Sequence, residues 1–138
     1  VSGYRGSPLG NLDQQLWQAA PFLARADIHF QPGLNEDLAA TAIWGSQQLG
    51  LFPGARVEGV FGLWYGKAPG VDRSGDALRH ANNAGTSPRG GALLLAGDDH
   101  AAKSSTVACH TELSLIDLNM PVLYPAEIGE LVEYGLYA

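Results

Sequence analysis

Two groups of polar side chains in this 138-residue chain have the types and spacing to take part in chemistry. The first centres on Glu36, which follows a Pro-Gly turn and lies between Leu34 and Leu38 in the sequence. A carboxyl group sheltered by apolar neighbours can keep a proton near neutral pH and exchange it with a bound molecule. The simpler interpretation is that Glu36 is a first-turn acidic residue, which the helix dipole favours.

The second group is the densest polar stretch of the chain, which begins at Gly97. Its chemically interesting members are Asp98, Asp99, His100, Lys103, Ser104, Ser105, His110 and Glu112. His100 could act as an acid or base, because histidine titrates near neutral pH. A metal-assisted hydrolase could use Asp99, His100, His110 and Glu112, but the spacing of these residues matches no zinc motif. A solvated loop explains the same residues more simply, so we assign no metal site.

The elements that must position these residues alternate between strands and helices. Apolar runs predict strands at 1–4, 28–31, 57–65, 91–96 and 121–124. Helical spacing and caps predict helices at 11–22, 36–49, 76–83, 111–118 and 126–137. This alternation predicts an α/β fold with three αβα layers around a mostly parallel sheet.

Ligands of such sheets bind beyond the carboxyl ends of the strands. Four polar, glycine-bearing segments leave strand ends here, at 3–10, 32–36, 66–75 and 97–105. The sequence therefore predicts a ligand site formed by these segments, with 66–75 as a loop.

Aromatic residues and the cysteine are expected to be structural. Trp44, Phe61, Trp64 and Tyr65 are interpreted as core residues, because they lie in or beside apolar runs. The single cysteine, Cys109, has no activating neighbour in the sequence and is expected to be unreactive.

Composition excludes several classes of function. The net charge is −6 and the eight basic residues are scattered, which argues against nucleic-acid binding. No apolar run is long enough to span a membrane, and one cysteine excludes an internal disulfide, so we expect a cytoplasmic protein. Charged residues make up 16%, which suggests that other protein parts cover much of the surface.

Five stretches resemble indolepyruvate ferredoxin oxidoreductases, which are thiamine diphosphate-dependent 2-oxoacid:ferredoxin oxidoreductases. They are residues 3–10, 31–45, 64–76, 80–88 and 97–100. The resemblance implies that residues 1–138 are a single pyrimidine-binding (PYR) domain, excised from a longer chain. It also implies the reaction, in which an aryl 2-oxoacid such as indolepyruvate is oxidatively decarboxylated, with CoA and ferredoxin, to an aryl-acetyl-CoA and CO2.

The resemblance implies roles for individual residues. Glu36 matches the glutamate that hydrogen-bonds N1′ of the aminopyrimidine, and Gly33 and Asn35 are expected beside the cofactor in the same motif. Ser7, Lys67 and His100 are expected to contact the substrate. The family's turn reads Tyr-Pro-x-Thr-Pro, so Ser7 stands for its threonine.

The resemblance also implies partners, because this segment can hold only the pyrimidine half of the cofactor. In the family, a separate PP-type domain with a Gly-Asp-Gly motif binds the diphosphate and Mg²⁺, and other regions carry 4Fe–4S clusters. Here Gly97-Asp98 is followed by Asp99, so that motif is missing. We expect a homo-oligomer that packs against these regions. The alternative is a non-catalytic interaction domain of the same fold, which packs against a partner chain.

Overall fold

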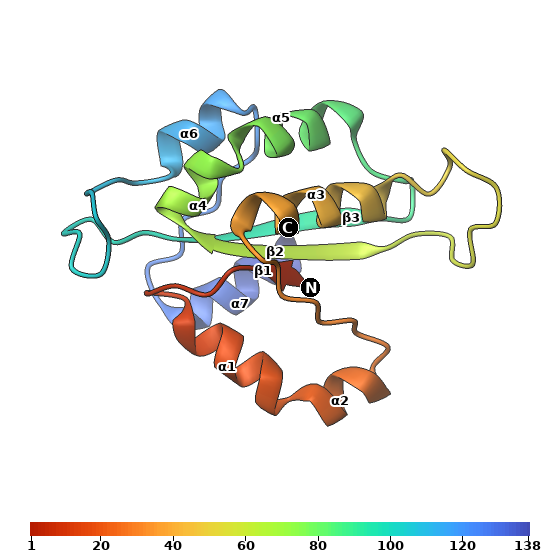
Figure 1. Ribbon diagram of the computed structural model, residues 1–138, viewed down its shortest axis with the longest axis horizontal. Coiled ribbons are helices and arrows are strands. Elements are labelled where there is room, and N and C mark those ends of the chain that lie inside the picture. Colours follow the sequence, from red (N-terminus) through yellow and green to blue (C-terminus); the bar gives the residue numbers. More distant parts are fainter.

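The computed structural model describes all residues from 1 to 138 and contains a three-stranded parallel sheet (Figure 1). The strands are β1 (Ser2–Gly3), β2 (Phe61–Lys67) and β3 (Gly91–Gly97), with β2 in the centre. In register, Trp64 of β2 pairs with Ser2 of β1 and Leu94 of β3. The α/β class and the parallel sheet are as expected.

Helices lie on both sides of the sheet, which is compatible with three αβα layers. One side carries α3 (Glu36–Gln47), α4 (Ala68–Arg73), α5 (Gly75–Ala84) and α6 (Glu112–Asp117). The other side carries α1 (Gly10–Gln18), α2 (Ala20–Arg25) and α7 (Ile128–Tyr137). The structure confirms most of the predicted helices and one of the predicted strands, with ends that differ by one or two residues. They are the helices expected at 36–49, 76–83, 111–118 and 126–137 and the strand expected at 91–96. No helix has the length and apolar content that crossing a lipid bilayer requires.

The core forms around two neighbouring aromatic residues of β2. Trp64 and Tyr65 are both fully buried, and they face opposite sides of the sheet because side chains alternate along a strand. Trp64 packs into an apolar cluster with residues of α3, α4, α5 and α6. Phe61 was expected in the core but is exposed. It shares the face of Tyr65 but lies at the other end of the strand.

Tyr65 connects the sheet to the helical layer on its own side. Its hydroxyl donates a hydrogen bond to Oδ1 of Asp13 in α1, at 2.6 Å. Asp13 is itself buried, so the pair anchors α1 beneath β2. Burial, together with the hydrogen bond to and the charge of Asp13, raises the pKa of Tyr65 far above its ordinary value.

The segment expected as one helix at 11–22 forms two helices, α1 and α2, which meet at Ala19. The physical reason is Pro21, which has no N–H to bond to the preceding turn and therefore suits only the first turn of a new helix.

The central strand begins and ends later than expected. Residues 57–60 are not a strand, because the ladder with β3 begins where Phe61 pairs with Gly91. The strand continues to Lys67, and α4 occupies most of the segment that was expected to be a loop at 66–75.

Two further predicted strands are wrong. Residues 28–31 run beside β1, where Gln31 and Gly33 donate backbone hydrogen bonds to Val1 and Gly3, but no regular ladder forms. Residues 121–124 pair with no strand. Val122 is the one residue of this segment that packs against the core, and Leu123 and Tyr124 are exposed. Residues 121–124 have no neighbouring segment that supplies ladder hydrogen bonds, whereas the segment around 28–31 makes only a few backbone bonds beside the two-residue strand β1.

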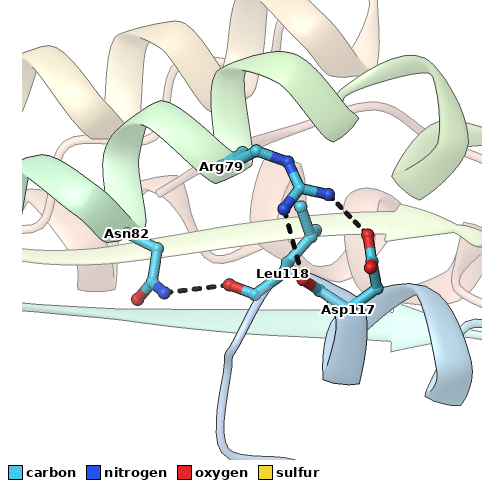
Figure 2. Close-up of polar contacts among 4 residues, drawn as sticks. All are labelled: Arg79, Asn82, Asp117 and Leu118. Atoms are coloured by element: carbon cyan, nitrogen blue, oxygen red, sulfur yellow. Dashed lines mark hydrogen bonds and ion pairs between the residues drawn. The ribbon is translucent and has the colours of Figure 1, made fainter.

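Polar contacts fasten α5 to the end of α6 (Figure 2). Arg79 forms an ion pair with Asp117 and also donates to its backbone carbonyl at 3.2 Å. Asn82 donates to the carbonyl of Leu118 at 2.9 Å. Leu118 belongs to the apolar core, so these bonds hold the end of α6 against both α5 and the core.

Candidate functional site

The loops that follow the three strands gather at one edge of the sheet. A Cβ on Gly6 would lie 3.1 Å from Cδ of Lys67, so the loop after β1 contacts the end of β2. A Cβ on Gly97, at the end of β3, would lie 2.7 Å from Leu9. Gly33 joins the same edge by donating its backbone N–H to the carbonyl of Gly3 at 2.8 Å. The structure therefore brings together the segments that the sequence assigned to a site.

Glu36 begins α3 at this edge, and its side chain is about nine-tenths buried. The indole N–H of Trp64 donates to the backbone carbonyl of Glu36 at 3.0 Å, which fixes the start of the helix on the sheet. The side chain lies against Gly70 of α4, where a Cβ would come within 2.5 Å of Cγ of Glu36. Gly70 is therefore the residue that makes room for this carboxyl group.

The residues expected to shelter Glu36 do not do so. Leu34 and Leu38 are 87% and 50% exposed. In a helix, a residue two positions away points to a different side, so Leu38 cannot cover Glu36. The shelter comes instead from α4, far along the chain.

The carboxyl group of Glu36 forms no hydrogen bond within the chain. Neither of its oxygens takes part in a hydrogen bond, and the nearest cation is Arg73, with 3.8 Å between Nη1 and Oε2. Arg73 is itself mostly exposed, so this ion pair is weak. The carboxyl group remains able to bond a molecule placed at the sheet edge.

The two other residues expected beside the cofactor have structural tasks at the same place. The side chain of Asn35 accepts a hydrogen bond from the N–H of Leu38 at 2.8 Å and so caps α3. A Cβ on Gly33 would lie 2.6 Å from the carbonyl oxygen of Asn35, so only glycine fits this turn. Their contact with a cofactor stays a prediction.

The three residues expected to contact substrate lie on the same side but differ in their surroundings. The ammonium group of Lys67 donates to the carbonyl of Ser104 at 3.2 Å and to Oγ of Ser105 at 3.3 Å. Ser7 is exposed in the loop that contacts Lys67. His100 is exposed and its ring stacks on that of His110, with centroids 6.4 Å apart.

The acidic residues after β3 organise their own loop. Asp99 accepts hydrogen bonds from the N–H groups of Lys103 and Ser104, which lower its pKa. Asp98 accepts from the N–H of Thr111 at 2.9 Å. No group of three or more His, Cys, Asp or Glu side chains is arranged to hold a metal ion. The metal-assisted hydrolase considered from the sequence therefore has no geometric support.

Cys109 lies near this loop and has the properties of a poor nucleophile. Burial raises the pKa of its thiol, and the charges of Asp72 and Asp98 raise it further. A raised pKa leaves less of the reactive thiolate at neutral pH.

The sequence interpretation missed the residues that set the environment of Glu36. Trp64 was expected in the core without a hydrogen-bond partner, and Gly70 was given no role. The sequence held no signal for Gly70, because 66–75 was expected to be a loop, where glycine is ordinary; only the formation of α4 makes this glycine a helix residue that packs closely.

Comparison of the chain with protein-family models, with curated proteins and with solved structures found no match.

Proposed function

We propose that this chain is the pyrimidine-binding domain of a thiamine diphosphate-dependent 2-oxoacid:ferredoxin oxidoreductase that acts on aryl 2-oxoacids such as indolepyruvate. The observation that carries the proposal is the nearly buried, unbonded carboxyl group of Glu36 at the carboxyl edge of a parallel sheet. The motif resemblance selects this family among the many that use such a sheet.

The residues at this edge suit one half of thiamine diphosphate. An aminopyrimidine nitrogen is a weak base, so its partner must be an acid that holds a proton away from water. Glu36 is a nearly buried acid at this edge, and neither of its oxygens forms a hydrogen bond. Asp98, after β3, also has a buried oxygen without a partner, Oδ1, but its Oδ2 accepts from the N–H of Thr111. The diphosphate and Mg²⁺ would be held by a PP-type domain, and the iron–sulfur clusters by other regions of the enzyme.

In this proposal, the residues at the site would act on the bound cofactor and substrate in separate ways. Bound thiamine diphosphate supplies the electron sink that decarboxylation of a 2-oxoacid requires. Glu36 holds a proton on its carboxyl group and donates a hydrogen bond to the ring nitrogen. Trp64 fixes the backbone of Glu36, and Gly70 leaves the space in which its side chain lies. Lys67 contributes positive charge near Ser7, where a substrate carboxylate would be oriented.

The test is Glu36→Gln in the full-length protein. Glutamine keeps the shape but cannot supply the proton, so 2-oxoacid- and CoA-dependent reduction of ferredoxin should fall by about 10²–10⁴-fold. Glu58→Gln, in the exposed loop before β2, is the matched control and should retain activity. Near-normal turnover of Glu36→Gln, with an unchanged unfolding midpoint, would reject the proposal.

A second candidate is a domain that serves only to associate with another chain. The observation in its favour is the apolar stripe on α7 formed by Ile128, Val132 and Leu136, which are 78%, 61% and 85% exposed. These residues are four apart and share one face of the helix. Self-association fits both candidates, so the two are distinguished by the Glu36 variant rather than by oligomeric state. Sedimentation of a clean monomer at high concentration would contradict the association itself.

A further inference from the structure

Helix α7 is attached to the rest of the protein by one of its faces. Leu131 and Tyr134 on this face line a cavity together with residues of β3. A Cβ on Gly135 would lie 4.0 Å from Cδ2 of Leu93, so the same face packs against the strand. No residue of α7 is buried, however, and the helix is therefore held loosely.

The outer face of α7 is apolar as well. It carries Ile128, Val132 and Leu136, called the α7 stripe below, and all three side chains are more exposed than buried. A surface helix of a globular protein normally turns polar residues to solvent, and a helix that is apolar on opposite faces is normally covered. The α7 stripe therefore lacks the covering segment that its composition requires.

An acidic edge borders the α7 stripe. Glu133 lies three residues before Leu136 and Glu130 three residues before Glu133, and residues with this spacing are neighbours on a helix surface. Neither glutamate forms an ion pair within the chain. No lysine or arginine follows Lys103 in the sequence, so the helix has no basic residue of its own to balance this edge.

The charge of this edge decides between the possible occupants of the α7 stripe. A second copy would dock the same patch on itself, as in any two-fold interface, and would bring acidic edges together. An anionic membrane would repel the edge, because helices that lie on membranes carry lysine and arginine beside their apolar face. From these observations we propose that the α7 stripe binds a partner protein through an amphipathic helix of that partner, which is apolar on one face and carries lysine or arginine beside it.

The inference adds the chemistry of the partner to the association considered above, and it does not depend on Glu36. A domain that binds a cofactor and a domain that only associates can both use this surface. Self-association of the chain then uses a different surface. Failure of the binding experiment below leaves the test of Glu36→Gln unaffected, and the reverse is also true.

The experiment measures the binding of a labelled synthetic peptide to the protein by fluorescence anisotropy. The peptide forms a helix with leucine along one face and lysine beside it, and the control peptide has glutamate in place of every lysine. The lysine peptide should bind more tightly than the glutamate peptide by about tenfold or more. Added salt should weaken its binding, because the charges involved are exposed.

Two variants test whether the peptide binds on α7. Leu136→Ser removes an apolar side chain from the stripe and should weaken binding of the lysine peptide by about tenfold. Glu133→Lys reverses the charge of the acidic edge and should weaken it by about three- to tenfold. The matched controls are Phe52→Ser, in the exposed loop before β2, and Asp76→Lys, on α5 at the other side of the sheet. Both controls should bind the peptide as the unaltered protein does.

Several results would overturn the proposal. They are equal binding of the two peptides, no binding of the lysine peptide, and equal effects of the α7 variants and their controls. Self-association that Leu136→Ser abolishes, measured by sedimentation, would show that a second copy occupies the stripe. Binding to vesicles of anionic lipid that Leu136→Ser abolishes would show that a membrane occupies it.

Discussion

The pair formed by Tyr65 and Asp13 allows a quantitative test of how α1 is attached to the sheet. Tyr65→Phe removes one hydroxyl from a fully buried side chain and leaves the shape of the ring unchanged. The hydroxyl is the hydrogen-bond partner of Asp13, which is 5% exposed, so the variant leaves a buried carboxyl group unsatisfied. Hydrogen bonds to charged groups contribute about 1.5–3 kcal/mol, and we expect a loss of that size in the free energy of unfolding.

Equilibrium unfolding in urea, followed by circular dichroism, measures this loss. At about 3–5 °C per kcal/mol for a domain of this size, Tm should fall by about 5–15 °C. Tyr124→Phe is the matched control, because Tyr124 is 58% exposed and should tolerate the same change. Combining Tyr65→Phe with Asp13→Ala should give less than the sum of the two single effects, since both remove one interaction. A change below about 0.5 kcal/mol, the range of ordinary surface substitutions, would refute the anchoring role.

The same pair predicts the response to alkaline pH. Burial and Asp13 raise the pKa of Tyr65, whereas a tyrosine in the unfolded chain titrates near its usual value of about 10. Above that pH the unfolded chain loses the proton while the folded protein keeps it, so this tyrosine makes the free energy of unfolding fall as pH rises. The slope is up to about 1.4 kcal/mol per pH unit. Unfolding measured from pH 8 to 11 should show a weaker decline in Tyr65→Phe, and identical slopes in the two proteins would contradict the assignment.

Three further predictions concern single contacts. Gly70→Ala places a Cβ within 2.5 Å of Glu36 and should lower the free energy of unfolding in urea by about 1–3 kcal/mol. Gly75→Ala, with open space around it, is the control and should leave this free energy unchanged. Equal effects of the two variants would show that the contact is unimportant. The raised pKa of Cys109 should make its alkylation by iodoacetamide at pH 7.5 slower than that of free cysteine, followed by mass spectrometry, and a faster rate would contradict it. Asn82→Ala removes the bond to the carbonyl of Leu118 shown in Figure 2 and should lower the free energy of unfolding in urea by about 1 kcal/mol. An unchanged value would show that this bond does not hold the end of α6.

Local sequence signals were sufficient for elements that depend on short-range contacts. The start of α3 follows from Asn35, whose side chain caps the helix within three residues. The strand β3 follows from an unbroken apolar run between glycines. The gathering of polar loops at one sheet edge also follows, because strands of a parallel sheet all end on the same side.

Distant contacts decided the rest. The segments 28–31 and 121–124 carry residue types that strands use, but a strand exists only where a second segment completes the ladder, and no local pattern records that. The burial of Glu36 depends on Gly70 and Trp64, roughly thirty residues away, rather than on its leucine neighbours. The sequence by itself determined which segments could form helices and strands and which residue types were present for chemistry, since these depend on near neighbours. Only the tertiary structure decided which side chains are sheltered and which face one another, because burial is set by whichever distant segments come to pack together.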